Sequence, residues 1–158
     1  RIAFLSGPEG SYTGDERHKG FMDAYNVSGL EIDKSIVFRC NYTMEQAYDC
    51  SLQLFKDKNP PTAIISANYD MTLGLISALN ELKLSIPDDV SVMGFDDMIL
   101  SKIITPRLWV VAQPMQQIAS HVAELTINRL LKNDTSPSKT LILNTELVEG
   151  GSIKNLNV

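Results

Sequence analysis

The sequence has 158 residues, of which 44% are hydrophobic and 21% are charged, and its formal net charge is −5. This composition is enough for the core of one domain and excludes an intrinsically disordered chain. The mild acidity and the lack of a long basic run argue against a nucleic-acid-binding surface in this chain. We find no apolar run of membrane-spanning length and no signal peptide in the sequence, and we expect no membrane partner.

The two cysteines, Cys40 and Cys50, lie ten positions apart. Small secreted disulfide scaffolds carry more cysteines in shorter chains, so this pair predicts free thiols, buried or half-buried, in a reducing cytoplasm. The sequence opens on Arg1 and enters an apolar strand at once, without an initiator methionine. We therefore expect it to be a piece of a longer cytoplasmic protein.

Strands and helices alternate over the first 95 residues. Runs of apolar and β-branched residues predict four strands, at 1–6, 35–40, 62–67 and 90–95. Apolar residues at helical spacing predict three helices: 13–25, a helix capped by Thr43 that stops at Asn59, and 69–83. This alternation predicts an α/β fold, with a parallel sheet covered by helices on both faces.

The regular alternation ends after Phe95. We predict an irregular connection over 97–106, a strand over 108–113, an amphipathic helix over 115–131, a polar linker over 133–138 and a last strand over 140–148. The tail beyond Gly150 is expected to fray, as chain ends without partners do.

The residues disfavour three kinds of site. The loop Gly7–Gly14 joins a strand to a helix but lacks the Gly-Lys-Ser/Thr ending and the GxGxxG spacing of nucleotide-binding loops. It is either a tight turn with Ser11 or Thr13 capping the helix, or a loop whose polar groups face a crevice. Only His18 and His121 are present, so no metal is expected, and no cofactor is implied. No GxSxG, HExxH or Cys/His pairing points to an enzyme.

Polar side chains follow the third and fourth predicted strands. The carboxyl ends of parallel strands form the ligand crevice of such sheets, so Asp96 is predicted to contact a small molecule, whereas Asp97 fits an acidic turn. Asn68 either shares that ligand or caps the next helix, and the two roles are compatible. Arg17 is either a solvated helix residue or a group that binds a carboxylate, a phosphate or vicinal hydroxyls.

Five segments, in this order, resemble the lactose/galactose repressor family of bacterial transcription regulators. They are Arg1–Pro8 with Arg17 and Gly20-Phe21; Pro60–Ile64; Ser66–Asn68 with Gly74; Ile86–Asp97; and Leu108, Val111, Gln113 and Pro114, with a weaker match over Leu141–Ser152. The resemblance implies one lobe of a two-lobed sensor built like periplasmic (type I) sugar-binding proteins. Residues 1–110 and 139–158 would form its carboxyl-terminal lobe. Residues 111–138 would form a hinge crossing and a helix of the other lobe.

The resemblance also implies the partners. The chain would be the effector-sensing part of a regulator whose helix-turn-helix domain, which binds operator DNA, lies outside this sequence. The effector would be a small molecule, most commonly a carbohydrate, although purines occur. A homodimer would form through Leu73, Ile76, Leu100 and Ile104. Without its own sheet, the helix 115–131 would have to pack on another surface.

The family's effector contacts fall on Arg17, Asn68 and Asp96, which would bind ligand hydroxyls. Tyr42 would present an aromatic face to a sugar or be a half-buried loop residue, and Gln113 would reach the ligand from the hinge. The family usually has Asp after the Asn of the third strand, whereas Tyr69 stands here and Asp70 follows.

Two other classes share this fold. One is a periplasmic sugar-binding protein of a transporter, and the other is an enzyme on a doubly wound sheet.

Overall fold

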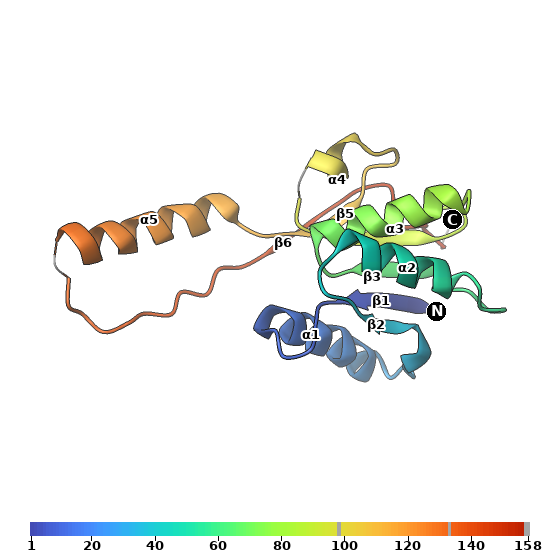
Figure 1. The fold of residues 1–158 in the computed structure, drawn as a ribbon, viewed down its shortest axis with the longest axis horizontal. Helices are drawn as coiled ribbons and strands as arrows, with labels where there is room; N and C mark the ends of the chain where they lie inside the picture. Colours follow the sequence, from blue (N-terminus) through green and yellow to red (C-terminus); the bar gives the residue numbers. More distant parts are fainter. Residues whose placement is uncertain (98, 133, 157–158) are drawn as a thin grey trace.

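The computed structural model describes residues 1–97, 99–132 and 134–156, which form one sheet flanked by helices and a long projecting arm (Figure 1). The strand order is β2-β1-β3-β4-β5-β6. The strands are β1 (Ile2–Ser6), β2 (Val37–Arg39), β3 (Ala63–Ser66), β4 (Ser91–Phe95), β5 (Trp109–Ala112) and β6 (Glu146–Val148). The helices are α1 (Tyr12–Ser28), the 3-10 turn η1 (Lys34–Ile36), α2 (Met44–Leu54), α3 (Tyr69–Glu81), α4 (Ile99–Ile103) and α5 (Met115–Leu131).

The first five strands pair in parallel, as predicted, whereas β6 runs antiparallel to β5. The predicted last strand over 140–148 is wrong in extent, because only Glu146–Val148 pair with the sheet. The chain before β6 returns along the arm, away from the other strands (Figure 1). The sheet is therefore mostly parallel, with one antiparallel edge strand.

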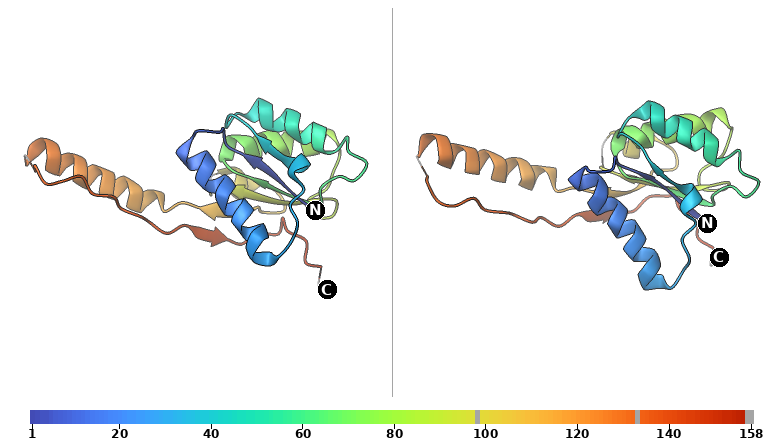
Figure 2. Two further views of the ribbon diagram at one scale, coloured as in Figure 1. Left: turned by 90° about the horizontal axis from the view of Figure 1, so that it is seen from below. Right: turned by 60° about the horizontal axis from the view of Figure 1, so that its bottom comes forward.

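Helices cover both faces of the sheet, as predicted. Helix α1 lies on one face, where the Phe21 ring stacks on Phe4 of β1 with centroids 4.6 Å apart (Figure 2). Helices α2 and α3 lie side by side on the other face. A Cβ at Gly74 of α3 would lie 2.1 Å from the carbonyl oxygen of Met44, so only glycine allows these two helices to pack so closely.

The core lies between the sheet and these helices. Its most buried side chains come from the strands and from α3: Leu5, Ile64, Val92, Val110, Met71, Leu75 and Leu79. Burying an aliphatic side chain of this size contributes roughly 1.5–3 kcal/mol. These residues hold the carboxyl ends of the strands in fixed register.

Several predicted boundaries are wrong. Helix α2 ends at Leu54, before the predicted stop at Asn59. Helix α1 continues to Ser28 and ends at Gly29, whose φ of 66° is left-handed. The predicted strand 35–40 begins with the turn η1, because the Asp33 side chain accepts a hydrogen bond from the Ser35 backbone N–H. The predicted irregular connection 97–106 contains the short helix α4, where Asp97 accepts a hydrogen bond from the Ser101 hydroxyl at 2.7 Å.

The tail after β6 is held against the sheet as far as Lys154, so the prediction that it frays beyond Gly150 is wrong for these residues. The Ser152 hydroxyl donates to the Val92 carbonyl at 2.6 Å and accepts from the Trp109 N–H at 2.8 Å. The Val92 N–H in turn donates to the Ser152 carbonyl at 2.9 Å. A Cβ at Gly150 would lie 2.3 Å from the Arg107 carbonyl oxygen, so glycine lets the tail reach this position.

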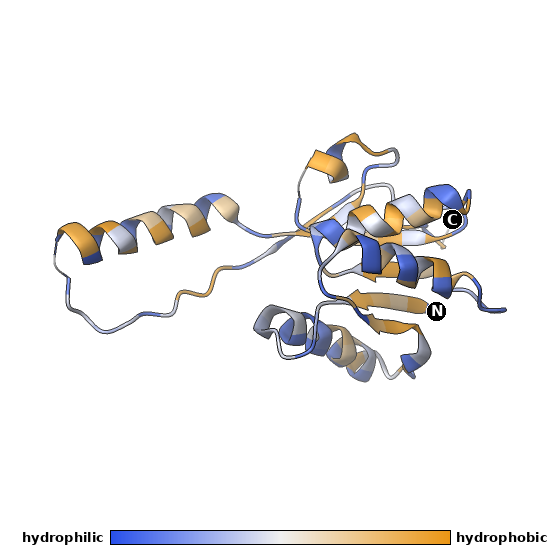
Figure 3. Ribbon diagram, viewed as in Figure 1, coloured by the Kyte–Doolittle hydropathy of each residue, from blue (hydrophilic) through white to orange (hydrophobic). Residues whose placement is uncertain are grey.

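Helix α5 has the predicted bounds but not the predicted packing. No residue of α5 is buried, and Leu130 and Leu131 at its end are 72% and 76% exposed. Figure 3 shows apolar stretches both on α5 and on the chain that returns from it. The expectation that α5 packs on another surface is not met within the part of the chain that the structure describes, and it stays a prediction for a surface outside this chain. Among those residues, none of the helices combines the length and apolar character of a membrane span.

We use the name sheet body for the six strands, helices α1 to α4 and the tail. We use the name arm for residues 113–145. The division of the chain into 1–110 with 139–158 and 111–138 as parts of two lobes stays a prediction. Four residues of the predicted segments lie outside the described residues: Met98 of the connection, Asn133 of the linker, and Asn157 and Val158 of the tail.

Candidate ligand-binding site

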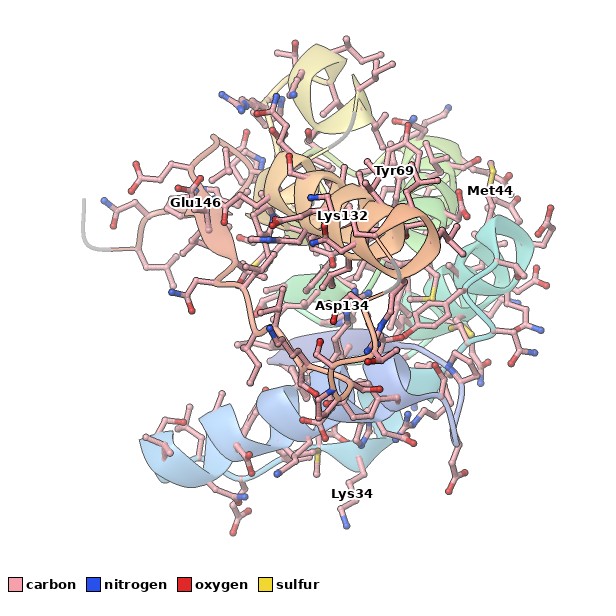
Figure 4. All side chains as sticks on the ribbon, turned by 90° about the vertical axis from the view of Figure 1, so that its left-hand side faces the viewer. Lys34, Met44, Tyr69, Lys132, Asp134 and Glu146 are labelled. Carbon is pink, nitrogen blue, oxygen red and sulfur yellow. The ribbon has the colours of Figure 1, made fainter. Side chains whose placement is uncertain are left out.

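The carboxyl ends of the parallel strands lie at the end of the sheet from which the arm projects (Figure 1). Figure 4 looks onto this end, with Tyr69 and Glu146 on opposite sides of α5. All five predicted effector residues lie on segments that follow or cover these strand ends: Arg17, Tyr42, Asn68, Asp96 and Gln113.

The Arg17 side chain crosses the ends of β3 and β4. One of its N–H groups donates to the Ala67 carbonyl oxygen, and its guanidinium carbon lies 3.6 Å from the centroid of the Phe95 ring. Ala67 precedes Asn68 and Phe95 precedes Asp96, so Arg17 contacts the residue directly before each of the other two predicted residues. The interpretation of Arg17 as a solvated helix residue is wrong, because its side chain is half-buried and held on two sides.

Asp96 adopts an unusual backbone conformation, with a φ of 74°. Its backbone N–H donates to the Val111 carbonyl at 2.9 Å, and its carboxylate accepts from the Gln113 side-chain amide at 2.6 Å. Left-handed residues other than glycine are uncommon, and they cluster at functional sites. Both bonds of Asp96 reach the segment that leads from β5 into the arm.

Tyr42 and Asn68 lie just before the first residues of α2 and α3, respectively. The Asn68 side chain accepts from the Met71 N–H at 2.9 Å, which confirms its predicted cap, and donates to the Tyr42 carbonyl at 3.4 Å. The Tyr42 hydroxyl lies 3.2 Å from the Thr13 hydroxyl. A Cβ at Gly7 would lie 2.2 Å from the Tyr42 ring, so the ring covers the first loop and is half-buried.

The first loop is held by charged groups that the sequence analysis did not identify. Arg39 donates to the Gly7 carbonyl at 3.2 Å and to the Asp15 carboxylate at 2.9 Å. The other Asp15 oxygen accepts from the Gly10 N–H at 3.0 Å. Ser11 occupies the helix N-cap position but makes no side-chain cap bond, so Asp15 fixes this loop instead.

His18, next to Arg17, points into the body. Its ring nitrogen Nδ1 lies 3.3 Å from the Ser6 hydroxyl. Burial, followed by the positive charge of Arg39, lowers the pKa of His18, which favours the neutral ring at pH 7. Within residues 1–97, 99–132 and 134–156, no group of three His, Cys, Asp or Glu side chains is placed to hold a metal ion.

A hollow of about 680 Å³ adjoins Asp96 at the start of the arm. Its lining includes Asp96, Asp97, Lys102, Gln113, Gln117 and Glu146. The hydrogen bond from Ser101, and then Lys102, lower the pKa of Asp97, which keeps this side chain ionised. Of the five predicted effector residues, Asp96 and Gln113 line the hollow, whereas Arg17, Tyr42 and Asn68 do not.

None of the four predicted dimer residues is fully exposed. Ile76 is buried in the core, Leu100 and Ile104 pack against it, and Leu73 is half-buried. The apolar surface of α4 comes instead from Ile99 and Ile103, which are 70% and 71% exposed.

The family model that describes the periplasmic binding protein-like domain matches residues 1–153. The chain belongs to this family. Over 155 residues it is 32% identical to the probable HTH-type transcriptional repressor ExuR of Bacillus subtilis, which covers 98% of this chain and 46% of that protein. The chain therefore spans about half the length of the curated relatives that it matches.

Two solved structures share the fold. A regulatory protein of the LacI family from Chloroflexus aggregans is 29% identical with a TM-score of 0.84, over 98% of this chain and 55% of that one. A complex of the transcriptional regulator CelR with cellobiose is 27% identical with a TM-score of 0.85, over 96% and 46%. These matches confirm the predicted resemblance to lactose/galactose repressors and do not favour the transporter alternative.

Proposed function

We propose that this chain is the effector-sensing and dimerisation part of a cytoplasmic bacterial transcriptional regulator. A small molecule, which we propose is a carbohydrate, would bind at the strand ends and change the operator affinity of a DNA-binding domain outside this chain. The observation that carries this proposal is the contact of Arg17 with Ala67 and Phe95, the residues that directly precede Asn68 and Asp96. The relatives are repressors, and we propose that this chain likewise has no enzymatic activity.

The site offers what a polyhydroxylated ligand needs. Arg17 presents up to five N–H donors, of which the bond to Ala67 uses one, and the Asp96 carboxylate accepts hydrogen bonds. Tyr42 adds an aromatic face for the C–H surface of a sugar ring. A purine would also bind the aromatic face of Tyr42. The preference for a carbohydrate therefore comes from the donors of Arg17 and the acceptor oxygens of Asp96.

The contacts of Asp96 suggest how binding would be transmitted. Its backbone bonds to Val111 and its carboxylate to Gln113, so a ligand on Asp96 acts on the segment that enters the arm. Hydrogen bonds to charged groups contribute about 1.5–3 kcal/mol each. A coupling of about 1–3 kcal/mol changes affinity at a second site roughly 5–150-fold, provided that the ligand prefers one arrangement of the protein.

Arg17→Ala in the full-length regulator tests the proposal. We expect operator binding to persist and the effector response to be lost, as measured by DNA binding with and without a panel of sugars and purines. Lys19→Ala is the matched control, because Lys19 is an exposed cation on the same helix. An Arg17→Ala protein that responds at normal effector concentrations would contradict the assignment.

The dimer is the second part of the proposal. We propose that the surface formed by Leu73 of α3 and by α4, with Ile76, Leu100 and Ile104 behind it, meets the same surface of a second copy. Exposed apolar patches on soluble proteins commonly mark such contacts. In sedimentation, Ile103→Glu should give monomers, whereas Val27→Glu, on the far helix α1, should not. A wild-type chain that sediments as a monomer at tens of micromolar would count against this interface.

A further inference from the structure

The two cysteines lie next to each other in the fold. Cys40 follows β2 directly, Cys50 lies in α2, and their sulfur atoms are 3.6 Å apart. Both are free thiols; Cys40 is fully buried and Cys50 is half-buried. One sulfur is therefore shielded, and the other lies closer to solvent.

Hydrogen bonds fix the segment between the two cysteines. The Cys40 N–H donates to the Ser6 carbonyl at 2.8 Å, which holds this residue against β1. The Asn41 N–H donates to the Gln46 side chain at 2.8 Å, and the Gln46 N–H donates to the Thr43 hydroxyl at 3.3 Å. The thiols therefore meet in the native fold, without local unfolding.

The two thiols also differ in their electrostatic surroundings. The Cys40 S–H donates a hydrogen bond to the Cys50 sulfur, and this bond lowers the pKa of Cys50. The same bond and burial raise the pKa of Cys40. The thiolate is the nucleophile in oxidation and exchange, so Cys50 is the attacking sulfur and Cys40 the resolving one.

We propose that Cys40 and Cys50 form a reversible dithiol–disulfide site that reacts with peroxides. The Cys50 thiolate attacks one oxygen of hydrogen peroxide and becomes a sulfenic acid, while the other oxygen leaves as hydroxide and takes up a proton. The Cys40 sulfur then attacks the Cys50 sulfur, and the sulfenic hydroxyl leaves with the Cys40 proton as water. Together the thiols lose two electrons and two protons, and the peroxide becomes two waters. A thiol reductant reverses the change.

The disulfide would act on the effector site. A disulfide bond joins its sulfurs at about 2.05 Å, so these two must move roughly 1.5 Å closer. Cys40 is two residues before Tyr42, whose carbonyl accepts from Asn68. Oxidation therefore shifts the aromatic face of the site, a consequence that rests on the proposed function.

Mass spectrometry of the native protein tests the site without any effector. After hydrogen peroxide treatment and alkylation, we expect the chain to have lost two hydrogens, to carry no alkyl group, and to recover both thiols with dithiothreitol. Cys40→Ser should leave a sulfenic acid on Cys50 that dimedone traps. Cys50→Ser should leave the buried Cys40 thiol intact. Peroxide that leaves both native thiols free, or that links two chains instead, would overturn the proposal.

The link to the effector is tested second, on chains shown by mass to be oxidised. We expect a several-fold change in effector Kd relative to the reduced chain and no such change in Cys40→Ser. Equal effector Kd values for the oxidised and reduced chains would show that the disulfide does not act on the effector site. The proposal would then keep only the reversible disulfide. If neither the reduced nor the oxidised chain binds any effector tested, that result would instead count against the proposed function.

Discussion

Helices α1 and α5 each have 17 residues, but they differ in what they contact. Helix α1 buries Phe21 against Phe4 of the sheet, whereas no residue of α5 is buried. Neither helix has a side-chain bond at its N-cap, so capping does not explain the difference. Both segments are helical, but only α1 packs its apolar side chains against the sheet.

The same contrast separates the sheet body from the arm. The body is stabilised by buried side chains, whereas the arm is held by local bonds such as that from Arg129 to the Asp134 carbonyl at 2.6 Å. Isolated helices of this length are marginally stable in water. The arm is therefore expected to open at a lower free energy than the body. Under the proposed function, the missing surface belongs to a second lobe outside this chain.

The largest difference expected between the sheet body and the arm is in the cost of truncating a leucine in each. Leu5 is fully buried in β1, so Leu5→Ala should lower the free energy of unfolding by about 2–5 kcal/mol. Leu125 of α5 is 40% exposed, so Leu125→Ala should change it by less than about 0.5 kcal/mol. Urea denaturation of the 158-residue chain measures both. Equal losses would show that the arm packs on the body in solution.

A second pair of variants compares two helical glycines. At Gly74 an added Cβ would meet the Met44 carbonyl, so Gly74→Ala should separate α2 from α3 and cost about 1–3 kcal/mol. At Gly20 of α1 nothing lies within 4 Å of an added Cβ, so Gly20→Ala should stabilise by up to about 1 kcal/mol. Thermal unfolding distinguishes the two signs. A Gly74→Ala protein as stable as the wild type would mean that α2 and α3 can move apart freely.

Much of the body follows from the sequence. Alternation of apolar strands and helices predicts its parallel order, and the positions of Asn68 and Asp96 after two strands predict that both lie at the same edge of the sheet. Three features depend on contacts between distant residues and leave no local pattern: the antiparallel β6, the packing of Ser152 on Val92, and the bonds of Arg39 to the first loop.

Some of the site was recognisable in principle. Phe95 directly precedes Asp96, and an aromatic residue beside a predicted carboxylate at a strand end indicates a surface on which a cation can stack. The position of Tyr42 over Gly7 was not predictable, because it depends on a left-handed backbone at Tyr42, with a φ of 59°.

A smaller effect is expected from Phe95, whose ring holds Arg17 in the proposed effector site. Phe95→Leu should weaken effector binding about 2–30-fold, because cation–π contacts contribute roughly 0.5–2 kcal/mol to the placement of Arg17. Phe95→Tyr keeps the aromatic face and should restore the affinity. Phe38→Leu, a half-buried aromatic change in β2, is the control for general damage. Calorimetric titration with the identified effector measures all three, and a Phe95→Leu protein with wild-type affinity would contradict the role.

The smallest expected effect concerns acid and compares one carboxylate of the body with one of the arm. Hydrogen bonds from Ser35 and Arg1 lower the pKa of Asp33 from 3.8 to about 2. A lowered pKa in the folded state contributes stability above the unfolded value, and this contribution is lost as the pH falls from about 4 toward 2. Asp33→Asn should therefore lower the unfolding temperature slightly near neutral pH and leave it unchanged at the acid end of that range.

Asp134, at the end of the arm, also has a lowered pKa, chiefly because its carboxylate accepts from the Ser136 N–H. If the arm opens separately from the body, Asp134→Asn should leave the main unfolding transition unchanged at every pH, despite the similar electrostatic origin of the shift. Unfolding followed by circular dichroism from neutral to acid pH compares the two variants. Equal, pH-dependent losses in both would mean that arm and body unfold as one cooperative unit, because a local bond can affect global stability only where its segment unfolds with the rest.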